Sequence, residues 1–462
     1  MVRTQQVEVT HRGRSDIELD SIGSDSPIGT LSLSSEEQQE EEAEDEEDYP
    51  DGGLKAYSVI IGSFLGLIVN LGIINSIGAV QAYVSTHQLA LVKASSISWI
   101  FSIYLSLAYA LGLVAGPIFD RRGPLELLVV STVLIFVGLM SSANSTKVYQ
   151  FILSFVCLGL GNGLGMTPLI GVISHWFLKK RGNFTGIATS GGSVGGLVFP
   201  LMLRHSYATY GYVWAMRILA FTCLGCMLLA LALVRGRLKR FPEQSDEEFD
   251  SKWDKFRSKL SFSTWKLNDK KYIFVIAGAF FAELSLVLLL TYFATYAIAQ
   301  GVSESTSLLL LTVWNGAGIL GRWLPGYISD HIGRFNVNIL MLTSYTLCIL
   351  VMWLPFGYSL KVLFAFSTIA GFCSGSILSL LPACLSQITP VNEIGSKYGL
   401  LNAILSIANL FGVPIASTII GNGSVHHYNN FVILVACLAV LGTCFWTLSR
   451  VTIAGVKLNV KV

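Results

Sequence analysis

Charged residues are scarce in this chain of 462 residues: they make up 13% of it, whereas 52% of the residues are hydrophobic. An ordinary soluble domain carries about 25% charged residues. So few charges could not cover the apolar surface of a soluble protein of this size, which excludes a soluble enzyme, a nucleic-acid-binding protein and a disordered scaffold. Phosphate-binding loops, zinc-ligand spacings and catalytic triads are missing too, so we expect no enzymatic activity, no cofactor and no metal.

The charges that are present divide the chain into two unlike parts. Residues 1–54 hold 16 acidic and 3 basic residues, and the remaining 408 hold 13 acidic and 28 basic residues, so the net charges are −13 and +15. From Glu36 to Asp48, ten of thirteen residues are acidic. Like charges repel and little apolar surface offsets chain entropy, so we predict that residues 1–54 form a disordered acidic tail.

The basic part contains twelve apolar runs, each long enough to cross a bilayer core, which takes about 20 residues per helix. The eight cysteines all fall inside these runs, which is typical of small buried residues. Six runs precede a polar stretch near residues 235–270 and six follow it. The predicted spans are residues 56–83, 97–118, 125–143, 148–172, 184–203, 212–234, 271–299, 306–328, 336–356, 361–387, 397–420 and 430–449.

This spacing predicts an all-α membrane protein of two six-helix bundles joined by a linker. The predicted parts are the tail at 1–54, bundles at 55–235 and 271–450, a linker at 236–270 and a C-terminal tail at 451–462. If the N-terminus is cytosolic, the cytosolic loops and the C-terminal tail hold twenty-one Lys and Arg residues, and the loops on the other side hold four. Cytosolic loops of membrane proteins are enriched in Lys and Arg, so we expect both termini, the tail and the linker to be cytosolic.

A short motif occurs once in each half. Gly116, Asp120 and Gly123 follow the second span, and Gly326, Asp330 and Gly333 follow the eighth, so both have the pattern GxxxDxxG at an offset of 210 residues. A repeat at this spacing indicates a duplicated bundle. We expect the glycines to allow close helix packing and each carboxylate to face the N-terminus of a neighbouring helix. The alternative is a plain turn that ends a helix.

These features resemble the major facilitator superfamily, and two stretches resemble its monocarboxylate-porter family. They are Asp51-Gly52-Gly53 before the first span and the run from Trp176 to Gly191 leading into the fifth. The run from Gly321 to Asn336 resembles a fungal branch that includes plasma-membrane riboflavin carriers. The resemblance implies transport by alternating access at a site built mainly from spans 1, 4, 7 and 10. It also implies that the paired motifs act as gates, and the gating candidates are Gly116, Asp120, Arg121, Gly123, Arg322, Gly326, Asp330, Gly333 and Arg334.

The chain departs from the proton-linked lactate carriers of that family. The position of their span-1 lysine falls on Asn75, and Gly318 stands where their span-8 aspartate precedes the arginine. Ionisable groups within the spans are few, with Glu283 and Arg322 in adjacent spans as a possible pair. Amides, hydroxyls and rings suit a flat neutral solute, although such residues also hold helices together. The substrate-binding candidates are Asn75, Asn162, Thr167, Glu283, Tyr292, Tyr296, Asn315 and Asn402.

We therefore predict a secondary carrier, with riboflavin as the first candidate substrate. The alternatives are a proton-coupled carrier of monocarboxylates or other organic anions, with Glu283 carrying the proton, and a nutrient sensor that does not transport. The expected partners are a small-molecule substrate and membrane lipid, without nucleic acid, and we expect a monomer. The plasma membrane is the first expectation for its location and the vacuolar membrane the alternative.

Overall fold

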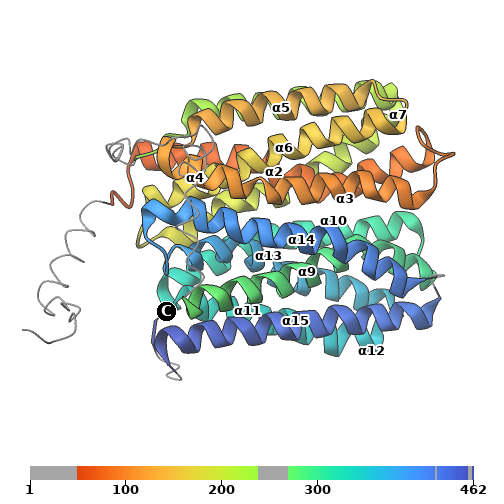
Figure 1. Cartoon of the computed structure of the whole chain (residues 1–462). Coiled ribbons are helices and arrows are strands. Elements are labelled where there is room, and N and C mark those ends of the chain that lie inside the picture. The colour runs from red at the N-terminus through yellow and green to blue at the C-terminus, as the bar shows by residue number, and fades with distance from the viewer. Residues whose placement is uncertain (1–48, 238–268, 422–423, 456–459, 462) are drawn as a thin grey trace, which may run out of the picture. The chain divides into compact units, whose positions relative to one another are not determined.

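A computed structural model describes residues 49–237, 269–421, 424–455 and 460–461. The predicted tail at 1–54, except for its last six residues, and most of the predicted linker lie outside these residues. The described part is helical, and its helices run side by side in Figure 1. Their bounds are α2 Leu54–Thr86, α3 Ala94–Ala110, α4 Gly112–Arg122, α5 Leu125–Ala143, α6 Val148–Gly171, α7 Arg181–Leu233, α9 Lys270–Ala299, α10 Glu304–Ile332, α11 Arg334–Cys348, α12 Leu354–Phe356, α13 Leu360–Leu385, α14 Ile394–Ile420 and α15 Val425–Ala454.

The twelve predicted spans are all present as helices. Ten helices of the described ranges are long and apolar enough to cross a membrane. One of them, α7, contains two predicted spans that meet at Gly211, where a φ of 73° reverses the chain direction. The twelfth span is α10, which is less apolar because it carries Arg322 and Asp330. The prediction of an all-α bundle with six spans in each half is thus confirmed.

Three spans contain local breaks in the helix. Leu111 separates α3 from α4 within the second span, and a π-helical turn at Ile349–Trp353 joins α11 to α12 within the ninth. A short 3-10 turn at Val172–His175 ends the fourth. Such breaks are tolerated in membrane helices where neighbouring helices cover the freed backbone groups.

Glycines set the spacing between helices of the N-terminal half. A Cβ atom added to Gly159 of α6 would lie 2.9 Å from the Tyr104 carbonyl oxygen of α3, and one added to Gly161 would lie 2.8 Å from the Ile135 nitrogen of α5. Helix α6 therefore packs tightly between α3 and α5. Without a hydrophobic driving force between helices in lipid, such close backbone packing supplies much of the attraction.

The two halves pack against each other through a few helices. Helix α10 packs on α7, and α14 packs on both α3 and α4 (Figure 1). We use the term basic end for the end of the bundle where α2 and α7 begin and α4 and α10 finish. It carries the cationic residues Arg121, Arg122, Lys179, Lys180 and Arg334.

Candidate functional site

Two aspartates at the basic end cap helices of the opposite half. Asp120, at the end of α4, accepts hydrogen bonds from the Gly395 and Ser396 nitrogens at 2.8 and 2.7 Å and from the Ser396 hydroxyl at 2.6 Å. Those two residues belong to the first turn of α14. A carboxylate at a helix N-terminus satisfies N–H groups that have no partner within the helix and interacts favourably with the helix dipole.

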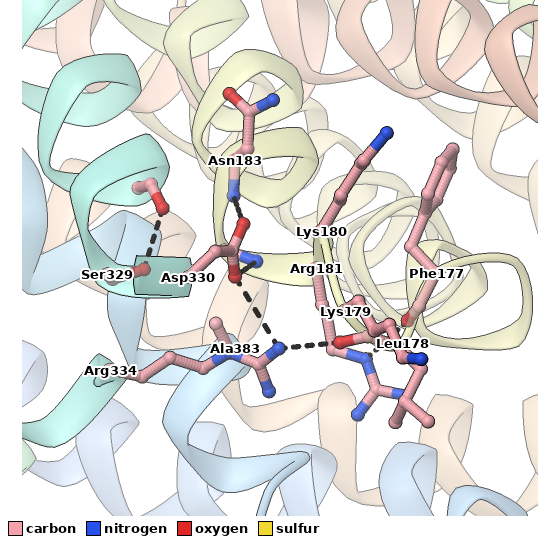
Figure 2. A network of polar contacts seen from close by, with 12 residues as sticks. Phe177, Leu178, Lys179, Lys180, Arg181, Asn183, Ser329, Asp330, Arg334 and Ala383 are labelled. Atoms are coloured by element: carbon pink, nitrogen blue, oxygen red, sulfur yellow. Dashed lines mark hydrogen bonds and ion pairs between the residues drawn. The ribbon is translucent and has the colours of Figure 1, made fainter. Parts of the chain in front are cut away.

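Asp330, at the end of α10, makes the equivalent contact with α7. It accepts hydrogen bonds from the Gly182 nitrogen at 2.9 Å and the Asn183 nitrogen at 2.8 Å (Figure 2). Arg334 lies 3.5 Å from the same carboxylate and donates to the Leu178 carbonyl oxygen at 2.7 Å. Each repeated motif therefore joins its own half to the first turn of a helix in the other half.

Glycines let the backbones approach beneath both caps. A Cβ atom on Gly116 would lie 2.2 Å from the Gly395 carbonyl oxygen, and one on Gly326 would lie 2.5 Å from the Gly182 carbonyl oxygen. Each of these distances is too short for a side chain, so a larger residue would force the halves apart. Gly123 and Gly333 follow the aspartates with φ values of 83° and 109°, which L side chains rarely adopt.

The helix starts that receive the two aspartates are also repeated in the sequence. Gly182 and Gly186 lie in the first turns of α7, and Gly395 and Gly399 lie in the first turns of α14. Both pairs of glycines are separated by 213 residues. A Cβ on Gly186 would lie 2.4 Å from the Arg322 carbonyl oxygen, which shows that the same close approach continues toward the membrane centre. Our sequence reasoning identified the aspartates and missed these receiving glycines, although the paired GxxxG spacing was a signal for them.

A small cavity lies at the centre of the bundle, between the halves. Its volume is about 20 Å³, which is room for about one water molecule. The polar side chains that line it come from both halves, and Trp314 and Leu286 are among its apolar residues. Its polar lining consists of Asn75, Ser193, Asn315, Arg322 and Ser374.

Arg322 reaches across the boundary between the halves. It is 5% exposed and donates from Nη1 to the Thr189 carbonyl oxygen of α7 at 2.7 Å, while its buried Nε has no hydrogen-bond partner. A buried guanidinium with an unused donor next to a cavity can bind a polar group of a solute. Arg322 therefore contributes to both the contact between halves and the cavity.

Glu283 is buried and does not form the expected ion pair with Arg322. Among the described residues, the structure shows no ion pair for Glu283, whose Oε1 atom is buried without a hydrogen-bond partner. The Tyr109 hydroxyl of α3 faces Glu283 and also lies near Arg322, and Tyr398 of α14 lies near Glu283. Our sequence reasoning missed both tyrosines because a buried tyrosine in an apolar span is an ordinary core residue. Arg217, the ionisable residue of the sixth span, donates to the Asn144 side chain at 3.0 Å.

The other predicted binding residues lie away from the cavity lining. Asn162 donates to the Asn70 carbonyl oxygen and the Tyr104 hydroxyl, within the N-terminal half. Tyr292 donates to the Val413 carbonyl oxygen. Three more are buried: Thr167, Tyr296, which packs on Trp353, and Asn402, which packs near Gly112. Of the eight candidates, only Asn75 and Asn315 line this cavity, and a solute-binding role for all eight stays a prediction.

The hydrogen bonds between the halves are all at the basic end or near the centre, as far as the described residues show. They involve Asp120, Arg181, Arg322, Trp323, Asp330 and Arg334. The structure therefore shows a bundle that is closed at its basic end. A carrier of this architecture exposes its central site to one side at a time as the two halves rock.

The Major Facilitator Superfamily family matches residues 58–360, and the chain belongs to this superfamily of membrane transporters. The chain is similar to the riboflavin transporter MCH5 of Saccharomyces cerevisiae, with 38% identity over 439 residues that cover 93% of this chain and 84% of that protein.

Two further similarities support the family assignment and the fold. An MFS-type transporter of Gibberella moniliformis is 34% identical over 90% of this chain and 95% of its own length. The human organic anion transporter MFSD10 has a similar structure, with a TM-score of 0.64 and 13% identity over 85% of this chain and 100% of that one. At this identity the structural likeness concerns the fold alone.

Proposed function

We propose that this chain takes up riboflavin by alternating access through the central cavity. The observation that carries the proposal is a cavity between the halves whose polar lining is mostly amides and hydroxyls beside the indole ring of Trp314. Amide groups match the hydrogen-bonding edge of a heterocycle, and an indole offers a face for stacking. The similarity to the yeast riboflavin transporter supports the same substrate.

The proposal places the basic end in the cytosol of a plasma-membrane protein. The excess of Lys and Arg at this end follows the positive-inside rule. The described state, closed at the basic end, then corresponds to a carrier whose gate toward the cytosol is shut. Because the cavity has room for only about one water molecule, binding of riboflavin requires the halves to separate at the opposite end.

Uptake by cells that cannot synthesise riboflavin tests this function. The chain should restore growth at limiting vitamin and accumulate labelled riboflavin. Asn315→Ala should raise the half-saturation concentration about tenfold, since the cost of an unpaired polar group is about 1–3 kcal/mol. Thr312→Ala, one turn away on α10 with its hydroxyl bonded to the Leu308 carbonyl oxygen, is the matched control. Normal expression without riboflavin uptake would refute the substrate assignment.

A second candidate is a proton-coupled carrier of organic anions. Arg322 favours it, because its buried guanidinium lines the cavity and could bind a carboxylate. Uptake of labelled lactate or pyruvate that a protonophore abolishes would support this candidate over riboflavin uptake. Absence of transport for both solutes would favour a sensor.

A further inference from the structure

Asp51 caps the loop that leads into α7. Its carboxylate accepts hydrogen bonds from three consecutive backbone nitrogens, those of Leu178, Lys179 and Lys180, at 2.9, 3.1 and 3.4 Å for Oδ1. The Asp51 nitrogen donates to the Trp176 carbonyl oxygen at 3.2 Å. The loop thus holds Asp51 at both its backbone and its side chain.

The backbone of Asp51 has an unusual conformation. With a φ of 42°, it is the only residue other than glycine in the described ranges with a positive φ. Such a conformation costs about 1–3 kcal/mol and persists where the surrounding contacts require it. The contacts between Asp51 and residues 176–180 are strong enough to maintain it.

Two carboxylates therefore share one helix start. Asp51 accepts from residues 178, 179 and 180, and Asp330 of the other half accepts from residues 182 and 183, so five of the six backbone nitrogens from 178 to 183 donate to these two aspartates. Asp51 belongs to the same half as the loop. Asp330 belongs to the opposite half, and its bonds must break when the basic end opens.

The capped loop also carries the other contacts between the halves at this point. The side chain of Arg181 is 1% exposed and donates to the Ser386 carbonyl oxygen of the opposite half at 3.0 Å. The Leu178 carbonyl oxygen accepts from Arg334 of the opposite half, as Figure 2 shows. Within its own half, the loop is also held by the Trp176 indole, which donates to the Arg235 carbonyl oxygen, just after α7 ends, at 2.9 Å. The orientation of this loop and of the first turn of α7 thus determines whether Asp330, Arg334 and Ser386 of the opposite half find their hydrogen-bond partners.

We propose that Asp51 is a positioning residue for the gate at the basic end. By fixing the backbone of residues 178–180, it holds the Gly182 and Asn183 nitrogens and the Leu178 carbonyl oxygen toward Asp330 and Arg334 before the halves meet. The closed state then forms without the entropic cost of ordering the loop. This inference rests on the proposed alternating access, and it does not depend on which solute is carried.

The negative charge of Asp51 opposes, in one respect, the closure of the basic end that its positioning role favours. Asp51 and Asp330 are like charges at one helix start, so removing Asp51 would also relieve repulsion on Asp330. The two effects have opposite signs: loss of positioning opens the basic end, and loss of repulsion closes it. We infer that positioning dominates because Asp51 has three backbone donors and Asp330 is also next to Arg334.

Distance measurements between spin labels test the inference without any solute. Labels at Arg122 and Ile332, which are exposed at the basic end in opposite halves, are placed in the full chain after its native cysteines have been replaced. Asp51→Ala should raise the ratio of open to closed populations about tenfold, as expected for loss of a helix N-cap. Asp269→Ala is the matched control, because Asp269 also caps a helix at this end but bonds Lys271 within its own half.

The outcomes separate the inference from the proposed function. A wider distance distribution in Asp51→Ala and an unchanged one in Asp269→Ala support the gate role even if riboflavin is not transported. An unchanged or narrower distribution in a stably folded Asp51→Ala protein overturns it. If Asp51→Ala does not fold, Asp51→Asn, which keeps the size and one acceptor oxygen, should show a smaller shift in the same direction. An unchanged or more closed Asp51→Asn protein overturns the inference as well.

Discussion

Replacing Gly116 by alanine should open the basic end of the transporter. The added Cβ would lie 2.2 Å from the Gly395 carbonyl oxygen and 2.9 Å from the Ser396 Cα atom, whereas ordinary contact begins at 3.4 Å. The overlap with the oxygen is therefore 3.4 minus 2.2, or 1.2 Å, and both contacts are backbone atoms that cannot rotate away. The overlap exists only while α4 of one half touches α14 of the other, so it penalises the closed state alone.

The expected size of the effect follows from the cost of overpacking, which is about 1–3 kcal/mol. Such a free energy corresponds to a change of about 5- to 150-fold in the ratio of open to closed populations. The assay is the spin-label distance across the basic end, together with the melting temperature. Uptake from outside should fall, because a smaller share of the carrier presents its site to that side.

The matched control is Gly138→Ala, whose Cβ would lie 2.8 Å from the Leu158 nitrogen within the same half. This change should lower the melting temperature and leave the distance distribution unchanged. The reasoning is refuted if Gly116→Ala keeps the wild-type distance distribution, or if both variants lose only thermal stability. Either result would mean that the contact between Gly116 and Gly395 does not distinguish the two states of the carrier.

Three further predictions concern single side chains at the gate and centre. Arg322→Lys should reduce uptake at equal expression by about tenfold or more, because lysine cannot bond the Thr189 carbonyl oxygen and still face the cavity. Unchanged uptake would contradict a role of Arg322 at the cavity. Ser396→Ala should raise the ratio of open to closed populations in the distance assay by only about fivefold, since Asp120 keeps two backbone donors. An effect as large as that of Asp120→Ala would show that the Ser396 hydroxyl dominates this contact. If the carrier is purely facilitative, Glu283→Gln should keep uptake within about fivefold of the wild-type rate, because a neutral hydrogen bond contributes about 1 kcal/mol. Loss of uptake with normal expression would indicate proton coupling through Glu283.

The number and order of the spans could be predicted from sequence because bilayer thickness alone requires long apolar runs. The turn at Gly211, between the fifth and sixth spans, falls where the apolar runs are interrupted. The position of Asp120 and Asp330 was also predictable, since a carboxylate that recurs at a helix end in both halves needs a similar partner each time. The partners themselves, the first turns of α14 and α7, were not predicted.

Which polar side chains share the cavity was decided by tertiary structure. Asn75 and Asn162 both lie in apolar spans with polar neighbours, yet the first lines the cavity and the second bonds Asn70 and Tyr104 within its own half. In a soluble helix the polar face would point to water, but here lipid and protein core are both apolar, so periodicity does not tell the inner face of a helix from the outer one. The apolar spans, their order and the charge asymmetry were determined by sequence alone. The rotation of each helix, and with it the surroundings of Glu283 and Arg322, came only from the packing of the helices, as did the contact of Asp51 with the loop before α7.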